Sequence, residues 1–176
     1  MPAQSIDARR DLVADGGRDG GTAGAVNLNA TAGDLQVRSI FARGGSDGQN
    51  AGTGNGANVT LTGTNIIQSN GEQIQTTSNR RNGTSGSFVA NASGNVTLGN
   101  INTQSSRVAG AGGIIDINAG GTGQTGALVS QGVGAGSVGG VMTIDSTGGN
   151  IATGIIDTDA DQAKGQAGHV RLTTPP

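Results

Sequence analysis

The stretch GGVMTIDSTGGNIATGIIDTD (residues 139–159) alternates apolar and small polar residues in three short bursts, with glycines between the first two bursts. Alternation with a period of two residues is the pattern of a β-strand that turns one face inward. Glycine supplies the positive φ angles that sharp corners need. The stretch therefore predicts three short strands joined by tight corners, a unit that is too thin to fold unless it is repeated.

Two series of triplets repeat along the chain in step with each other. In the first series two apolar residues flank one other residue, and the intervals between first members are 33, 29, 27, 27 and 28: Val26/Leu28, Val59/Leu61, Phe88/Ala90, Ile115/Ile117, Met142/Ile144 and Val170/Leu172. The second series pairs an apolar residue with a small one, and its intervals are 28, 34, 27, 27 and 28: Leu12/Ala14, Ile40/Ala42, Ile74/Thr76, Ile101/Thr103, Leu128/Ser130 and Ile156/Thr158. Because the long intervals of the two series coincide, we infer an internal repeat of about 28 residues.

A third, weaker burst lies between the two series in some repeats. Each example follows Gly-Asp or Gly-Asn: Leu35/Val37, Val96/Leu98 and Ile151/Thr153. The burst is blurred around Ile66 and Ile67, and it cannot be placed after Ile115. Three short strands per repeat predict an all-β fold, a parallel β-helix (β-solenoid) of about six coils of ~28 residues with three short strands in each coil. We expect one domain over residues 1–176, with an N-terminal half-coil (1–24), full coils (25–168) and a C-terminal half-coil (169–176).

The composition agrees with a thin, regular fold. Glycine makes up 35 of the 176 residues, and the chain has two Phe and no Tyr, Trp or Cys. Ordinary cores rely on large side chains, so we expect an interior one side chain wide. The net charge of −2 and the scarcity of aromatic residues argue against nucleic acid as a partner. No apolar run is long enough for a membrane span, and the start shows no apolar segment typical of a signal peptide.

Stacking of the coils about 4.8 Å apart places each inward residue against its counterpart in the next coil. We therefore expect Phe88 to be buried in the column of the first series, whereas Phe41 lies between two inward residues and points outward, one coil from Val13. Small polar residues just after the first strand form another column, which either hydrogen-bonds from coil to coil or only favours turns: Asn29, Thr62, Asn91, Asn118, Asp145 and Thr173. The glycine-rich corners 44–56 and 78–86 are expected to carry the variation in length.

Three stretches that carry the repeat, GAVNLNATAGDLQVRSIFARGG (24–45), GGIIDINAGG (112–121) and residues 139–159, resemble the repeats of filamentous-haemagglutinin-like exoproteins of two-partner secretion. The resemblance covers nearly the whole chain. It implies a right-handed parallel β-helix at the surface of a bacterial cell or outside it, used in adhesion, in a fibre or in a biofilm matrix. Members of that family are usually far longer, and this sequence has no secretion motif of the Asn-Pro-Asn type.

Few residues are candidates for catalysis. The only histidine, His169, directly precedes an inward residue and therefore points outward near the last coil. Asp116 and Arg171 share an outward column but lie two coils apart, about 10 Å. Enzymes with this fold need acidic pairs, or acidic and basic residues, gathered on one outer face. We therefore predict that the chain is not an enzyme.

Asp157, Asp159 and Asp161 are the only candidate metal ligands in the sequence pattern, and they resemble the first half of a calcium loop. The glycine and glutamate that complete an EF-hand are replaced by Gln162 and Ala167. Alternation places the three aspartates on the outward face, where water is a sufficient partner. We predict no cofactor, with calcium as the alternative.

The chain opens with the second half of a coil, which contains Ile6 and Leu12, and closes with the first half of one, which contains Val170 and Leu172. Complementary half-coils predict that copies stack head-to-tail into a filament, with these four residues at the interface. The alternatives are a cut through a longer array, a segment of a long secreted adhesin, or a monomer with blocked ends. We expect a non-enzymatic structural or adhesive β-solenoid, extracellular or on the cell surface, whose main partner is itself. A surface glycan or a host or matrix component is a further candidate partner, and the alternative functions are a glycan-binding or glycan-cleaving module and a calcium-stiffened surface protein.

Overall fold

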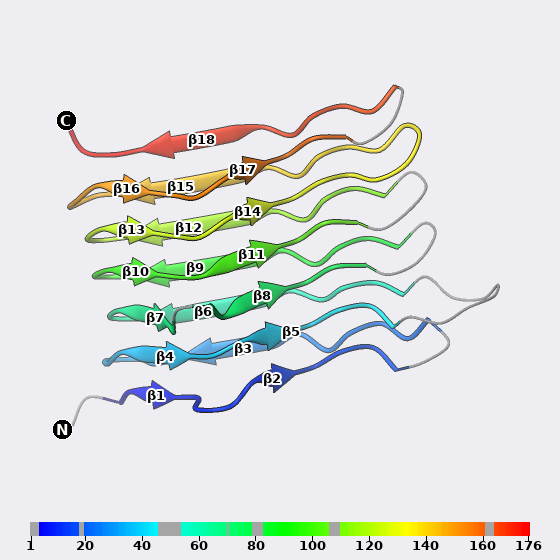
Figure 1. The fold of residues 1–176 in the computed structure, drawn as a ribbon. Coiled ribbons are helices and arrows are strands. Elements are labelled where there is room, and N and C mark those ends of the chain that lie inside the picture. The colour runs from blue at the N-terminus through cyan, green and yellow to red at the C-terminus, as the bar shows by residue number, and fades with distance from the viewer. Residues whose placement is uncertain are drawn as a thin grey trace.

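The structure is a computed structural model that describes residues 4–17, 20–45, 54–69, 71–78, 83–105, 110–160 and 164–176. Within these residues every regular element is a β-strand. The chain winds in coils that lie one above the other, with the N-terminus and the C-terminus at opposite ends of the stack (Figure 1). The predicted all-β fold is confirmed.

In the part of the chain that the structure describes, three parallel sheets run through the stack, and each contains six strands. Sheet A consists of β1 (Ile6–Asp7), β4 (Leu35–Val37), β7 (Ile66–Gln68), β10 (Val96–Thr97), β13 (Gly123–Gln124) and β16 (Ile151–Ala152). Sheet B consists of β2 (Leu12–Val13), β5 (Ile40–Phe41), β8 (Gln73–Gln75), β11 (Asn100–Asn102), β14 (Leu128–Val129) and β17 (Ile156–Asp157). Sheet C consists of β3 (Val26–Asn29), β6 (Val59–Gly63), β9 (Phe88–Ala92), β12 (Ile115–Ala119), β15 (Met142–Ser146) and β18 (Val170–Thr173). The chain visits the sheets in the order C, A, B, so β3 to β17 form five complete coils between the partial coils β1–β2 and β18.

The register of the strands follows the two triplet series. Sheet C aligns the whole first series in one inward column, from Val26 to Val170. Sheet B aligns the second series in the same way, from Leu12 to Ile156. Because each coil turns the same class of residue inward, the core is a set of columns in which middle members such as Ile115 are fully buried.

Sheet A explains why the sequence shows no third burst after Ile115. In β13 the inward position is taken by Gly123, which pairs with Val96 of the preceding coil and Ile151 of the following one. A strand whose inward residue has no side chain leaves no apolar signal in the sequence. In β7 the inward residue is Ile66, whereas Ile67 points outward and is 39% exposed, so two adjacent apolar residues blur the alternation there.

The two phenylalanines lie on opposite sides of the sheets, as expected. Phe88 is fully buried between Val59 and Ile115 in the column of sheet C. Phe41 points outward from sheet B beside Val13, which is 66% exposed. The ring of Phe41 is only half-buried, but the guanidinium of Arg43 lies 4.7 Å from its centroid and shields it from water. Part of the apolar surface formed by Phe41 and Val13 is therefore covered by Arg43.

A ladder of side chains connects the coils at the corner between sheets C and A. Asp34 Oδ1 accepts from the backbone N of Asn65 at 3.2 Å, and Asn65 Oδ1 accepts from that of Asn95 at 2.8 Å. Asn95 Oδ1 accepts from the backbone N of Thr122 at 2.8 Å and from its hydroxyl at 3.0 Å. Each acceptor satisfies an N–H group that lies just outside a strand. Two of the Gly-Asp and Gly-Asn pairs of the sequence, Gly33-Asp34 and Gly94-Asn95, belong to this ladder.

The polar column that starts at Asn29 differs from its prediction in position, and it hydrogen-bonds from coil to coil at one step only. Its first four members lie in β3, β6, β9 and β12, within the strands of sheet C rather than after them. The one direct hydrogen bond between described side chains of this column runs from Asn118 Nδ2 to Asn91 Oδ1 at 3.0 Å. The more continuous side-chain ladder is thus the corner ladder described above.

Between sheets B and C each coil makes a detour, which we call the glycine-rich extension and which lies on the right in Figure 1. Its outgoing and returning halves are joined at the same position in each coil by a backbone hydrogen bond, as from Gly113 N to Thr103 O at 2.8 Å. The equivalent bond in the next coil runs from Gly140 N to Ser130 O at 2.7 Å. The extension comprises the described residues of segments 14–24, 42–57, 76–86, 103–113, 130–140 and 158–168.

Glycine is needed in this extension because the backbones lie too close for side chains. A Cβ on Gly86, Gly113 or Gly168 would overlap a backbone carbonyl oxygen of the neighbouring coil. By contrast, positive φ angles occur at few of the described glycines: Gly20, Gly54, Gly71, Gly134 and Gly136. The expectation that glycines chiefly supply positive φ at sharp corners is therefore wrong. Their main role here is to let the backbones of neighbouring coils approach each other closely.

The small residues of the second series lie where the extension leaves the body. Thr76, Thr103 and Ser130 are fully buried. The Thr76 hydroxyl donates to Gly86 O at 2.6 Å, and the Thr103 hydroxyl donates to Gly113 O at 3.1 Å. A larger apolar side chain at these positions would displace the returning backbone, so the chain uses small residues whose hydroxyls bind it.

The variation in coil length has two sources. In the first complete coil the bond that closes the extension joins Ala57 N to Ala42 O, whereas in the next coil it joins Gly86 N to Thr76 O and closes a shorter segment. The predicted variation at 44–56 is thus confirmed. The prediction for 78–86 is wrong, because that extension has the same length as those at 103–113 and 130–140. The other extra residues lie between β7 and β8, at the corner that contains Glu72.

Candidate functional site

The predicted calcium ligands show no shared site in the part of the chain that the structure describes. Asp157 Oδ2 accepts a hydrogen bond from Gln131 Nε2 at 2.6 Å, and its Oδ1 accepts from the backbone N of Asp159 at 3.1 Å. The Asp159 side chain is exposed, and Asp161 lies outside the described residues. Among the described residues no group of three or more His, Cys, Asp or Glu side chains could hold a metal ion. Calcium binding stays a prediction.

The four predicted assembly residues lie at the two ends of the stack. Ile6 and Leu12 are half-buried in β1 and β2. Val170 and Leu172 are 37% and 49% exposed in β18, although the residues that precede them in the same columns, Met142 and Ile144, are almost fully buried. The inward columns therefore continue to the surface at the C-terminal end.

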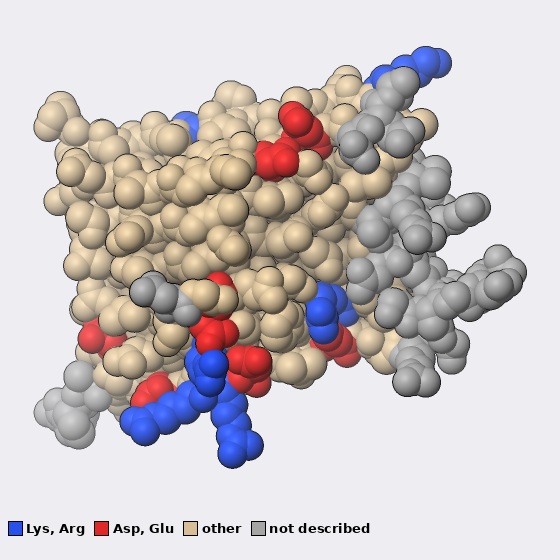
Figure 2. Space-filling model, viewed as in Figure 1, with Lys and Arg blue, Asp and Glu red and all other residues tan. Residues whose placement is uncertain are grey.

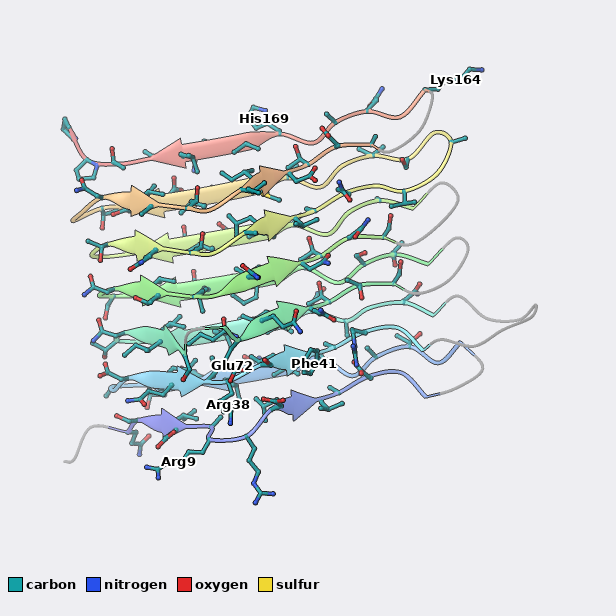
Figure 3. All side chains as sticks on the ribbon, viewed as in Figure 1. Arg9, Arg38, Phe41, Glu72, Lys164 and His169 are labelled. Carbon is teal, nitrogen blue, oxygen red and sulfur yellow. The ribbon has the colours of Figure 1, made fainter. Side chains whose placement is uncertain are left out.

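The residues weighed as possible catalytic groups remain apart. His169 is exposed at the C-terminal end of the stack (Figure 3). Asp116 and Arg171 occupy one outward column with Thr143 between them. Arg171 instead binds Asp145, with an Nη2–Oδ2 distance of 2.5 Å.

A charged network that the sequence did not reveal lies in a groove between sheets A and B at the N-terminal end. Arg38 follows β4, and Glu72 lies in the longer corner before β8. The Arg38 Nη2 to Glu72 Oε1 distance is 2.6 Å. The Ser39 hydroxyl donates to the other carboxylate oxygen of Glu72 and accepts from the backbone N of Gln73 at 3.2 Å. Asp11 approaches the opposite side of Arg38, with an Oδ1–Nε distance of 4.0 Å, so the network joins three successive coils.

Figure 2 shows these charged side chains gathered over the N-terminal coils, and Figure 3 shows Arg9, Arg38 and Glu72 on the same face. The groove has a volume of about 410 Å³ and is lined by Asp7, Arg9, Arg38 and Glu72, among other residues. Glu72 is only 14% exposed in its side chain, whereas Arg38 is 51% exposed. Since acidic and basic groups alternate around it, the groove has no strong net charge.

Hydrogen bonds hold the carboxylates of this region in the ionised form. The Ser39 hydroxyl and then the Arg38 guanidinium lower the pKa of Glu72 below its ordinary value. In the neighbouring extension, partial burial acts to raise the pKa of Asp15, but the hydrogen bonds and charge of Arg43 outweigh that effect and lower it. Both carboxylates therefore stay ionised to lower pH than ordinary carboxylates do. Their main role is to join coils.

The Asp15 and Arg43 pair is the best-defined ion pair of this region. Arg43 Nη2 lies 2.5 Å from Asp15 Oδ2, and the backbone N of Arg43 donates to Asp15 Oδ1 at 2.8 Å. Arg43 also covers the ring of Phe41 and reaches Gln75 Oε1 at 3.4 Å. One arginine thus connects the first partial coil with the two coils that follow.

A second groove, lined by uncharged residues, follows the corner between sheets C and A. It has a volume of about 330 Å³. Its lining residues are Asn29, Ala30, Thr31, Thr62, Gly63, Thr64, Asn91, Ala92, Ser93 and Asn118. The groove crosses four coils. Four of these residues belong to the predicted polar column, so this feature was visible in the sequence as a column but not as a groove.

The Arg38 network could not be seen in the sequence, because its members come from three coils and each resembles an ordinary surface residue. The one available signal was the long interval between Ile40 and Ile74, which includes the extra residues near Glu72. The same interval also contains the longer extension at 42–57, so its length alone did not show that there were two insertions.

Comparison of the chain with protein-family models, with curated proteins and with solved structures finds no match. No helix among the described residues is long and apolar enough to cross a membrane.

Proposed function

We propose that this chain is a non-enzymatic structural and adhesive β-solenoid that stacks head-to-tail into a filament outside a bacterial cell. The resemblance of its repeats to those of filamentous-haemagglutinin-like exoproteins supports the extracellular location and the adhesive role. The head-to-tail assembly is supported by the shape of the two ends of the stack.

The observation that carries the proposal is the uncovered core in β18. Residues whose side chains point inward donate their backbone N–H to the next coil toward the C-terminal end. Examples are the bonds from Val26 N to Asn58 O and from Met142 N to His169 O. Val170 and Leu172 occupy the same inward positions one coil later, and their side chains are 37% and 49% exposed. Strand edges with unpaired groups and exposed apolar residues are templates for further strands.

The opposite end offers a surface that matches this edge. A coil made of β18 from one copy and β1–β2 from the next would contain one strand of each sheet. It would place Ile6 over Ile151, Leu12 over Ile156, and Val26 and Leu28 of the second copy over Val170 and Leu172. Every inward column would then continue with an aliphatic residue. Such a heterologous contact does not close into a ring and produces an open filament.

Sedimentation velocity and negative-stain electron microscopy of the purified chain test the proposal. We expect fibres one solenoid wide from the wild type. Leu172→Asp and Leu12→Asp remove the apolar contact and are expected to stay monomeric while keeping the β-type circular dichroism signal. Ile114→Asp is the matched control, because Ile114 is also 49% exposed but lies outside the ends, and it should still form fibres.

A wild-type protein that stays monomeric at high concentration would overturn the filament proposal. Equal loss of fibres in Ile114→Asp and Leu172→Asp would also contradict it, because the effect would then come from the added charge alone.

A further inference from the structure

We infer that the uncharged groove between sheets C and A binds a neutral linear polysaccharide that lies across the coils. This inference rests on the proposed adhesive function, and it names the ligand class of that adhesion. The groove is defined by its lining residues, of which Asn29, Thr62, Asn91 and Asn118 form one side.

The register of sheet C makes that side of the groove periodic. Asn29 pairs with Thr62, Thr62 with Asn91, and Asn91 with Asn118. The groove therefore presents an amide or a hydroxyl group once per coil, at intervals of about 4.8 Å. A linear sugar polymer likewise presents hydroxyl groups at regular intervals along its length, so several coils can bind one chain.

The lining residues also provide the hydrogen-bonding groups that sugar hydroxyls need. An asparagine amide both donates and accepts, as does the hydroxyl of Thr62, Thr64 or Ser93. The side chains of Asn29 and Thr62 make no hydrogen bond to any other described residue, so their groups are available to a ligand. The strand ladder holds the backbone beneath them in place, which lowers the entropy lost on binding.

The inward residues between these side chains are small. Ala30 and Ala92 are 3% and 9% exposed, and Gly63 occupies the equivalent position in β6. Ala30, Gly63 and Ala92 line the groove together with the outward residues, so no large side chain covers the backbone there. A sugar chain can therefore approach the backbone closely.

Charge distinguishes this groove from the one between sheets A and B. All the residues that line it are uncharged, whereas the other groove is lined by Asp7, Arg9, Arg38 and Glu72. An anionic polymer would find no basic partner in the uncharged groove. The geometry thus favours a neutral polysaccharide. Without aromatic residues for stacking the affinity of one groove is low, and many grooves along a fibre would raise it through avidity.

The test compares Thr62→Val with Thr60→Val. Both residues lie in β6 and point outward, two positions apart, but only Thr62 lines the groove. Binding of each variant and of the wild type is measured by co-sedimentation with insoluble cellulose and starch and by titration with soluble mannan, with alginate as the anionic comparison.

We expect the wild type to bind at least one neutral polysaccharide and not alginate. Thr62→Val should weaken this binding roughly 3- to 10-fold, as expected for one lost hydrogen bond, and Thr60→Val should leave it unchanged. Perturbation of the side-chain amide signals of Asn29 and Asn91 by the bound polysaccharide gives a second readout that depends on no substitution.

Three results would overturn the inference: no binding of any neutral polysaccharide, binding of alginate alone, or equal weakening by the two variants. Fibre formation is measured separately, by sedimentation without polysaccharide. A protein that forms fibres and binds no glycan would contradict this inference alone, whereas a monomer that binds glycan at the groove would contradict the filament alone.

Discussion

The strand-bearing body and the glycine-rich extension belong to the same coils but are stabilised in different ways. In the body, columns of aliphatic side chains such as Ile115 and Ile144 are removed from water. In the extension, the backbones of successive coils approach so closely that a Cβ on Gly113 would overlap Gly86 O. Both regions keep the hydrogen-bond ladder between coils. Burial of apolar surface dominates the first region, and backbone contact the second.

This difference gives the high glycine content a physical reason. A body with three strands per coil needs inward side chains of moderate size, and the chain supplies them in the triplets. The extension needs almost none, since two backbones already fill its thickness. A substitution that adds or removes carbon atoms should therefore have opposite effects in the two regions.

The largest expected effect is loss of the one aromatic ring in the core. Phe88→Ala leaves a cavity between Val59 and Ile115 and should reduce the free energy of unfolding by roughly 3–5 kcal/mol. Phe41→Ser removes an outward, half-buried ring and should cost much less. Urea unfolding followed by circular dichroism measures both. Equal destabilisation would show that the inward and outward faces are assigned incorrectly.

Adding one methyl group to the extension is the converse experiment. Gly113→Ala forces the Gly86 carbonyl away and should destabilise the protein by about 1–3 kcal/mol, or more if the two backbones cannot separate. The loss should appear as faster amide exchange at residues 83–86 and 110–114. A variant as stable as the wild type would refute the claim that close approach requires glycine there.

Acidification should destabilise the part of the extension that the Asp15–Arg43 ion pair holds together. The pKa of Asp15 is lowered in the folded protein, so its contribution to stability is complete above the ordinary aspartate pKa, near 4, and is lost as the pH falls through the folded value. The Tm of the wild type should therefore fall as the pH is lowered below about 4. Asp15→Asn should be less stable at pH 7 and lose less on acidification. Parallel pH profiles for the two proteins would rule out this role.

The smallest expected effect is a gain. Gly123 occupies an inward position in the body, and a Cβ there would lie 3.8 Å from Ile144 Cγ2 and 3.9 Å from Ile151 Cγ1, which is ordinary contact. Gly123→Ala should stabilise the protein by about 0.4–1 kcal/mol, because it adds a buried methyl and restricts the unfolded chain. If the comparison is correct, thermal unfolding shows opposite changes in Tm for Gly123→Ala and Gly113→Ala, which lie in adjacent coils. A loss of stability in both would contradict it.

The sequence alone predicts most of the body. Alternation identified the inward residues of sheets B and C and their register, because each strand there contributes a visible apolar residue. It missed β13, whose inward residue is Gly123, and it could not choose between Ile66 and Ile67. These failures have one cause. The alternation of apolar and polar residues shows only what kind of side chain is present, and it does not show which way the backbone turns that side chain.

The extension and the charged network were less predictable. A glycine at a sharp corner and a glycine at a close backbone contact look the same in the sequence. The role of Gly113 can therefore be recognised only from the structure. Arg38, Ser39 and Glu72 meet only because coils stack at a given register and the corner before β8 is longer. The uncharged groove was partly predicted as a polar column from Asn29, but a column in the sequence does not show that the surface beside it is concave.

Disulfide cross-linking tests most directly whether the solenoid continues from one copy to the next. Asp7 and Ala152 lie in the same outward column of sheet A, at opposite ends of the stack. They are about 24 Å apart within one molecule, too far for a disulfide, but would be neighbours at about 4.8 Å across the proposed interface. The chain has no cysteine of its own. The double variant Asp7→Cys/Ala152→Cys should therefore give a ladder of covalent oligomers on non-reducing gels after mild oxidation. Asp7→Cys/Gln124→Cys, with its second cysteine one coil further from the end, should remain monomeric. No ladder from the first variant, or the same ladder from both, would contradict head-to-tail continuation of the coils.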